Sequence, residues 1–158
     1  MLTSHGAARI IFMARGPVGL SFVGKSEEIS LQEVGGLVIF SLALDTLRTG
    51  ISFRDRNMRE RFLETTLHPY ARLEVERSEL LWPESGPVSA KVKAKLTLHG
   101  VTRSVNVGYQ AQGSCHHANI EGSLHINMKS FKIETPSHLG MTVRPGLDIS
   151  LKMGVLKQ

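Results

Sequence analysis

The stretch VSAKVKAKLTL, residues 88–98, alternates apolar and polar side chains along its whole length. The apolar positions are Val88, Ala90, Val92, Ala94, Leu96 and Leu98. The positions between them include three lysines, which a helix would scatter around its circumference. In a β-strand, alternate side chains point to opposite faces. The stretch therefore predicts a strand with one buried and one solvated face.

The same alternation continues in both directions along the chain. It appears clearly at residues 101–111, 119–128 and 147–153, and more weakly at residues 8–14, 18–24, 37–44 and 71–80. The links His99-Gly100 and Gly113-Ser114 are too short for crossover helices, so neighbouring strands should be antiparallel. Eight one-sided strands remove their exposed edges when they close into a barrel. We therefore predict an all-β fold, an antiparallel eight-stranded barrel, with residues 1–158 as a single domain.

Residues 52–65, SFRDRNMRERFLET, break this alternation and predict one short helix. Ser52 or Asp55 is the expected cap, because short polar side chains can bond to the free N–H groups of a first turn. Met58 and Phe62 are four residues apart and would form an apolar stripe. We expect this helix to lie over one opening of the barrel.

Residues 19–26, GLSFVGKS, match the spelling of a phosphate-binding loop, G-x-x-x-x-G-K-S. Such a loop needs small residues that let its N–H groups curl around a phosphate before a long helix. Here the interior residues are bulky and alternate as in a strand. Only residues 27–36 separate this segment from the next apolar run. That interval is too short for a crossover between parallel strands. We therefore predict a strand at this position and no nucleotide site.

The chain carries a formal net charge of +5, which suits an acidic ligand, an anionic lipid or nucleic acid. Lys91, Lys93 and Lys95 have no aromatic residues between them on which bases could stack, so we predict no nucleic-acid partner. No apolar run reaches the ~20 residues of a membrane span. The first residues lack the features of a secretory signal. We expect a cytoplasmic protein as the sequence stands, and a periplasmic one if a signal peptide was removed.

The seven histidines and the single cysteine show no metal-site or catalytic pattern. Cys115-His116-His117 is contiguous in an expected turn and lacks a second pair of ligands at zinc-site spacing. His125 alternates outward, and His99 is expected to shape or cap a turn. The chain has no G-x-S-x-G motif. We predict no catalytic residue, metal or cofactor, although a catalytic triad assembled only in space remains the alternative.

Two segments resemble the YceI-like family. Residues 44–69 resemble its succession of a strand, a T-G pair, an R-D pair, a helix and an H-P pair. The matching residues are Thr49-Gly50, Arg54-Asp55, Met58, Leu63 and Pro69. Residues 96–107, LTLHGVTRSVNV, resemble its "LT-hydrophobic-HGVT" hairpin. The resemblance implies a lipocalin-like barrel with an apolar central cavity.

Members of that family bind polyisoprenoids or similar long amphiphiles, are commonly periplasmic and often dimerise. The resemblance therefore implies a polyisoprenoid, quinone or fatty-acyl ligand and allows a homodimer. Three features depart from the family pattern. Asn57 stands where the helix often has histidine, the first strand pair lacks the histidines of many members, and Lys132 replaces the glycine of a late R-x-D-F-G motif.

An eight-stranded barrel either fills itself with side chains or holds one small ligand. Small inward side chains would leave room for a ligand, although they equally suit the taper of a filled barrel. We expect them at Ala43, Ala71, Ala90, Ala94 and Gly122. The predicted function is binding, with transport or sequestration, of a long-chain polyisoprenoid or similar lipid. The alternative is a hydrolase or other enzyme that acts on an isoprenoid-like substrate.

The predicted ligand contacts are inward-facing apolar residues of the strands and the helix. Those of the cavity are Phe12, Phe22, Leu42, Leu73, Val75, Val92, Leu96, Val105, Val107, Ile126 and Met128, with Met58 and Phe62 at the mouth. Arg54 and Arg59 are the predicted contacts of an anionic head group. A solvated helix face would explain the same run of arginines.

Overall fold

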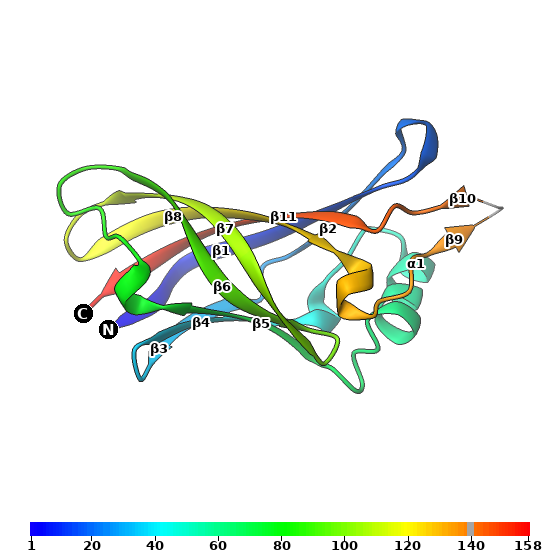
Figure 1. Ribbon diagram of the computed structural model, residues 1–158, viewed down its shortest axis with the longest axis horizontal. Helices are drawn as coiled ribbons and strands as arrows, with labels where there is room; N and C mark the ends of the chain where they lie inside the picture. Colours follow the sequence, from blue (N-terminus) through cyan, green and yellow to red (C-terminus); the bar gives the residue numbers. More distant parts are fainter. Residues whose placement is uncertain (139–140) are drawn as a thin grey trace.

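In the computed structural model, which describes residues 1–138 and 141–158, the chain forms a closed antiparallel barrel (Figure 1). The strands are β1 (Leu2–Arg15), β2 (Ser21–Ser26), β3 (Ile29–Val34), β4 (Leu37–Ala43), β5 (Tyr70–Glu76), β6 (Val88–Leu98), β7 (Val101–Gly113), β8 (His117–Asn127), β9 (Ser137–His138), β10 (Met141–Thr142) and β11 (Gly146–Lys157). The helical segments are η1 (Pro17–Gly19), η2 (Leu44–Thr46), α1 (Ser52–Asn57), the π-helical η3 (Met58–Phe62), η4 (Arg77–Glu79) and η5 (Met128–Phe131).

The last strand closes the sheet onto the first. β11 pairs with β8 on one side and with β1 on the other, from Leu2 opposite Lys157 to Ala14 opposite Leu147. β2 and β3 share one barrel position, because β2 pairs with the end of β1 and β3 meets its beginning, where Thr3 lies opposite Gln32. The barrel therefore has eight strand positions, and the predicted fold is confirmed. The short strands β9 and β10 form a separate two-stranded sheet.

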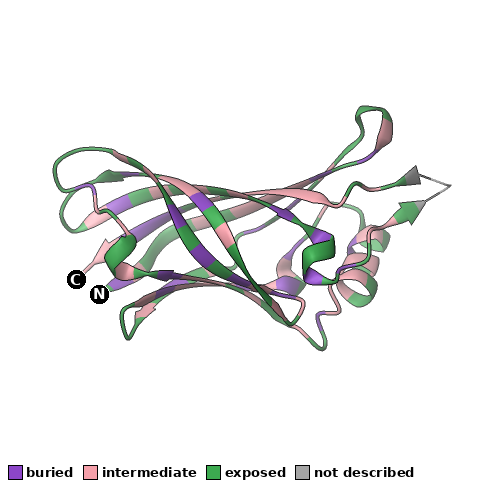
Figure 2. Ribbon diagram, viewed as in Figure 1, coloured by how far each residue is buried: buried purple, intermediate pink, exposed green. Residues whose placement is uncertain are grey.

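The predicted faces of β6 and β8 are also correct, whereas Ala43, expected inward, lies on the opposite face of β4 from the inward Leu42. β6 has the predicted bounds, and its buried residues alternate with exposed lysines (Figure 2). Ser123 and His125 on β8 are exposed, as their outward alternation predicts. A register slip of one residue would reverse a whole strand, so the buried face fixes the pairing. None of the helices in the described residues is long and apolar enough to cross a membrane.

The segment that matches a phosphate-loop spelling is a strand, as predicted, but it begins at Ser21 rather than Val18. Val18 lies instead in the turn η1 with φ +58°. Gly24, which would be the second glycine of a phosphate loop, lies opposite Phe12 on β1. A Cβ at Gly24 would collide with the Phe12 ring. This glycine therefore permits close packing between two strands.

The strand β3 was not predicted, because its inner face carries a carboxylate. Ile29 and Leu31 alternate correctly, but the next inward residue is Glu33. The Glu33 carboxylate accepts a hydrogen bond from the Leu2 backbone N–H at 3.2 Å and lies 3.6 Å from Arg77 Nε. Polar partners therefore allow an acidic residue where the alternation calls for an apolar one.

The two chain termini lie at the same end of the barrel (Figure 1), and buried side chains fill the interior at that end. Leu80 and Trp82, from the segment that follows β5, pack against a buried cluster there, and Trp82 Nε1 donates to the Ser114 carbonyl at 2.8 Å. The cluster consists of Leu2, Leu31, Val38, Met153 and Val155. The opposite end carries α1, the β1–β2 turn and the β9–β10 pair (Figure 1).

The predicted role of His99 in a turn is confirmed. His99 and Gly100 join β6 to β7 with φ of +55° and +73°, a conformation that histidine adopts more readily than most side chains. His99 Nδ1 lies 3.0 Å from the Phe131 carbonyl, and its Nε2 lies 2.7 Å from Glu64 Oε1. The imidazole therefore ties the hairpin to η5 and to the segment after η3.

Lys132, which replaces a family glycine, still adopts the left-handed conformation that the turn needs. It ends η5 with φ +57° and ψ +30°, and its N–H donates to the Lys129 carbonyl at 3.1 Å. A side chain in this region costs about 1–2 kcal/mol relative to glycine. The turn is therefore preserved at an energetic cost.

We predict that Lys132→Gly raises the free energy of unfolding by about 0.5 kcal/mol, because the steric cost that it removes, ~1–2 kcal/mol, exceeds the entropic cost of glycine, ~0.5–1 kcal/mol. Lys93→Gly, in the extended backbone of β6, is the matched control and should lower it by about 0.5–1 kcal/mol. Urea denaturation of both variants checks the prediction. An equal loss of stability in the two variants would contradict it.

Candidate functional site

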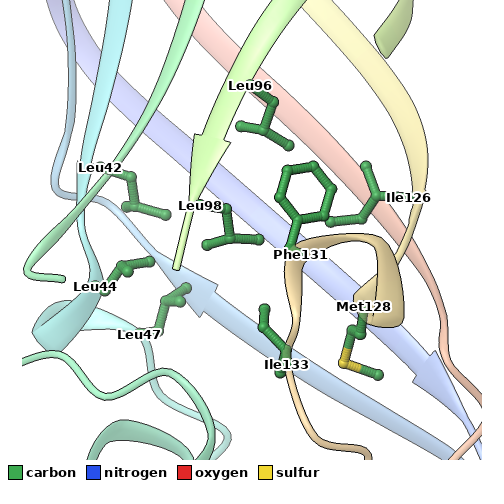
Figure 3. Close-up of a cluster of buried hydrophobic side chains, with 9 residues drawn as sticks. All are labelled: Leu42, Leu44, Leu47, Leu96, Leu98, Ile126, Met128, Phe131 and Ile133. Carbon is green, nitrogen blue, oxygen red and sulfur yellow. The ribbon is translucent and has the colours of Figure 1, made fainter. Parts of the chain in front are cut away.

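The half of the barrel nearest α1 encloses a cavity of about 650 Å³. A cluster of nine buried apolar residues surrounds this region (Figure 3). Seven of the nine also line the cavity, namely Leu42, Leu44, Leu47, Leu96, Leu98, Met128 and Ile133. The apolar core of this half is therefore the wall of a hollow space.

The cavity ends where the filled half of the barrel begins. Phe40 lies on the wall and also packs against the buried clusters of the filled half. Leu73 and Leu124 likewise line the cavity and pack against Val75, Val92 and Ala94. The cavity is therefore blocked toward the chain termini and reaches the surface at the α1 end.

The polar residues of the wall belong to segments at the α1 end. They are Thr49, Arg54, Asn57, Arg61, Arg72, Ser137 and Thr142. Among the described residues of the wall there is no histidine, cysteine, aspartate, glutamate, lysine or tyrosine. No group of three metal-binding side chains occurs in the described part of the chain. The wall thus offers an apolar interior with hydrogen-bond donors at its mouth.

Three residues that carry the family resemblance hold α1 at the mouth. The Thr49 backbone N–H donates to Asp55 Oδ1 at 2.8 Å, and the Thr49 hydroxyl donates to the same oxygen. Arg54 Nε donates to the Thr49 hydroxyl at 2.9 Å, and Arg54 Nη2 donates to the Thr49 carbonyl at 3.2 Å. These bonds join the helix to the segment before it.

The predicted capping of the helix is wrong. The residue that precedes the first turn is Ile51, and no side chain caps it. Asp55 is instead turned toward Thr49, where it satisfies two donors of the preceding segment. Met58 and Phe62 nevertheless line the mouth together with Leu63.

The Asp55 carboxylate is buried but stays ionised. Burial raises the pKa of a carboxyl group, but the hydrogen bonds from Thr49 and the positive charge of Arg59 outweigh it. They hold the pKa of Asp55 below its ordinary value of 3.8. Folding therefore favours the ionised form.

Most of the predicted contacts do lie on the cavity wall. They are Phe12, Phe22, Leu42, Met58, Phe62, Leu73, Leu96, Met128 and Arg54. Arg54 also stacks over the Phe22 ring, 5.5 Å from its centroid. Whether these residues bind a ligand stays a prediction.

Five predicted contacts lie elsewhere in the core. Val75, Val92 and Val107 form the buried cluster beyond the bottom of the cavity, with Val105 packed against it. Ile126 belongs to the cluster around the cavity but does not line it. Alternation predicts which face of a strand points inward, but it does not predict how far along the barrel the interior is hollow.

The structure also changes the assignment of arginines and small residues. Arg59 does not line the cavity, and its Nη2 donates to the Leu47 carbonyl at 2.8 Å. Arg61, which belongs to the same run of arginines but was not one of the two predicted head-group contacts, lies on the wall instead. Of the five small residues expected to leave room, only Ala71 lines the cavity.

Several wall residues lie outside the strands, where alternation gives no signal. Leu44 begins the turn η2, Leu47 follows it, and Phe53 belongs to the first turn of α1. Pro136 and Val143 lie beside the β9–β10 pair. Their apolar character was visible in the sequence, but their approach to the mouth depends on tertiary packing.

The outer face of the barrel carries a separate histidine and carboxylate pair. His125 Nδ1 lies 2.7 Å from Asp148 Oδ1, and Asp148 also pairs with Arg15. The hydrogen bond from His125 and then that from Arg15 lower the pKa of Asp148. Because His125 and Asp148 are absent from the cavity wall, this pair cannot act on a ligand inside it.

We predict that Asp55→Asn lowers the free energy of unfolding by about 1–2 kcal/mol at neutral pH, because bonds to a charged acceptor become bonds to a neutral one. The difference should be largest above the ordinary carboxyl pKa of 3.8 and shrink as the pH falls below it, since Asp55 then takes up a proton in the native protein too. Urea titrations of both proteins at several pH values check this. A difference that grows in acid would contradict the assignment.

Solved structures with the same fold come from several organisms. A polyisoprenoid binding domain from Saccharophagus degradans implicated in plant cell wall breakdown matches with a TM-score of 0.82 and 14% identity, over 99% of this chain and 98% of that one. BcnA from Burkholderia cenocepacia matches with a TM-score of 0.74 and 13% identity, over 93% and 95%. The YCEI protein of Campylobacter jejuni matches with a TM-score of 0.63 and 14% identity, over 85% and 84%.

No curated protein matches the chain in sequence. The family model of the YceI-like domain, however, matches residues 7–154, which include all or most of every strand of the closed barrel. The predicted resemblance is thereby confirmed over nearly the whole chain. This chain belongs to the YceI-like domain family.

Proposed function

We propose that the cavity binds the apolar chain of a polyisoprenoid or a similar long amphiphile and carries or sequesters it. The observation that carries this proposal is the distribution of polarity along the wall: the interior is apolar, and the polar residues belong to the mouth. An amphiphile with a long apolar tail and a polar head has the complementary distribution. A structural neighbour described as a polyisoprenoid binding domain supports the same ligand class.

The size of the cavity suits such a ligand. Its volume of about 650 Å³ falls within the range of sites that enclose small molecules. Burial of one methylene contributes ~0.8 kcal/mol, so a five-carbon isoprene unit contributes at most about 4 kcal/mol. Two or three buried units would thus approach the roughly 8 kcal/mol of a micromolar complex after the costs of ordering. Apolar burial is therefore a sufficient source of affinity.

Two arginines of the wall are suited to the polar end of the ligand. Arg61 lies on the wall, and its guanidinium lies 3.8 Å from Glu134 in an exposed pair that contributes little to stability. Arg54 keeps N–H groups beyond those that bond to Thr49. A phosphate or carboxylate head group at the mouth would accept hydrogen bonds from both.

The residues of the cavity wall favour a binding protein over a hydrolase. The described wall residues include no side chain of the kind that usually acts as a general base, and His99 is held between Glu64 and Phe131 instead. Turnover of prenyl esters or pyrophosphates by the purified protein, abolished by substitution of His99, would establish the hydrolase in place of the carrier.

We expect the protein purified from its native source under mild conditions to retain a polyprenyl, quinone or fatty-acyl lipid. Native mass spectrometry should detect the complex, and organic extraction followed by mass analysis should identify the lipid. Absence of such lipids from the extract, together with failure of added geranylgeraniol to bind, would rule out the proposed function.

We predict that Ala71→Phe weakens the binding of geranylgeraniol roughly a hundredfold, because the ring takes up space for about one isoprene unit, worth ~3 kcal/mol after partial rearrangement. Ala71 lines the cavity beside Leu42, its pairing partner on the adjacent strand. Ala7→Phe, at an exposed position of β1, is the matched control and should bind as the unmodified protein does. Fluorescence competition measures both affinities, and equal affinity of the two variants would place the lipid outside the cavity.

A further inference from the structure

The rim of the cavity mouth exposes large apolar side chains to solvent. Val18 is 94% exposed, Phe53 72% and Leu20 44%. Leu20 and Phe53 also line the cavity, so the apolar surface continues from the interior onto the outside. Ile51, beside Phe53, is 52% exposed. An exposed apolar patch beside the opening of a binding site is typical of a surface that contacts a membrane or another protein.

Val18 is the most informative of these residues, because two unfavourable features coincide in it. It occupies the tip of the β1–β2 turn with φ +58° and ψ +39°. A β-branched residue rarely adopts this left-handed conformation, which favours glycine or asparagine. The turn thus holds an apolar side chain in water in a strained backbone. Strain of this kind is typical of functional positions.

The positive charge of the chain is concentrated at the same end. The mouth segments 15–22, 51–62, 132–138 and 141–145, together with the wall residue Arg72 and with Asp148, which pairs with Arg15, contain eight arginines and lysines against four acidic residues. The rest of the chain is nearly balanced, with eleven basic against ten acidic residues. Asp55, one of the four acids, is turned inward toward Thr49. The mouth is therefore both apolar and basic, which matches an anionic lipid surface.

We propose that the mouth rim, defined by Val18, Leu20, Ile51 and Phe53, docks on the surface of an anionic phospholipid bilayer. The apolar side chains enter the interface while arginines such as Arg56 meet the lipid head groups. The cavity then opens directly onto the membrane, and an apolar chain can pass between the two without crossing water. Docking concerns the outer rim and adds to the proposed lipid binding a defined route of entry.

A second copy of the chain fits this rim less well. In a two-fold dimer, the same patch faces itself, so the basic residues of one mouth would lie against those of the other. Like charges opposed in this way disfavour association. Anionic lipid supplies both the negative charge and the apolar phase that the rim lacks.

Flotation with vesicles of equal parts phosphatidylcholine and phosphatidylglycerol tests the proposal on the whole chain. The unmodified protein should float with these vesicles and much less with pure phosphatidylcholine. Val18→Asn should weaken flotation roughly tenfold through the loss of one buried apolar side chain. Asparagine suits the left-handed conformation, so this variant should unfold at an equal or higher urea concentration. Arg56→Glu should also weaken flotation about tenfold at low salt.

Matched variants elsewhere separate the rim from general surface effects. Val34→Asn alters a valine that is 54% exposed beside the Gly35-Gly36 turn at the filled end. Lys93→Glu gives the same charge change as Arg56→Glu, but on the outer face of β6. Both controls should float as the unmodified protein does. Equal losses in the rim and control variants would overturn the proposal.

Two further outcomes would overturn docking while leaving lipid binding intact. One is a folded protein that binds geranylgeraniol in detergent but never floats with anionic vesicles. The other is a dimer, seen by light scattering without vesicles, that Val18→Asn dissociates, because a second copy would then cover the rim. Conversely, flotation of a protein that yields no extracted lipid and fails to bind added geranylgeraniol would refute the proposed function and leave docking standing.

Discussion

The pairing of β1 with β11 is the interaction on which the rest of the structure depends. It joins the two ends of the chain along almost the whole length of both strands and turns an open sheet into a closed wall. Closure leaves no unpaired edge there and forces alternate side chains into a shared interior. This enclosed space is divided into a filled half and a hollow half, and the helix lies at the open end of the hollow half.

Alternation along the strands was enough to predict the barrel and its buried face. In β6 the lysines are exposed and the intervening apolar residues are buried because no other register keeps the charges in water. The pattern failed for β3, where Glu33 lies inward and is stabilised by Arg77 and the Leu2 N–H. Alternation alone predicts that such a residue faces outward, because the partners that stabilise it inside come from distant positions in the chain.

The candidate site was only partly predictable for a similar reason. Leu96 and Val92 belong to one face of one strand, yet Leu96 lines the cavity and Val92 lies beyond its bottom. The difference arises from Leu80 and Trp82, which fill the other half from outside the strands. The hydrogen bonds among Thr49, Arg54 and Asp55 explain why these residues carry the family resemblance: they hold the helix at the mouth.

Nuclear magnetic resonance of the complex can show whether a lipid chain enters the one-ended apolar cavity. With methyl groups labelled in the leucine, valine and methionine residues and geranylgeraniol bound, intermolecular contacts should reach Leu42, Leu96 and Met128 on the wall. They should be absent at Val75 and Val92, which lie beyond the bottom of the cavity. Contacts to the outward-facing Met13 in place of the wall methyls would contradict the account.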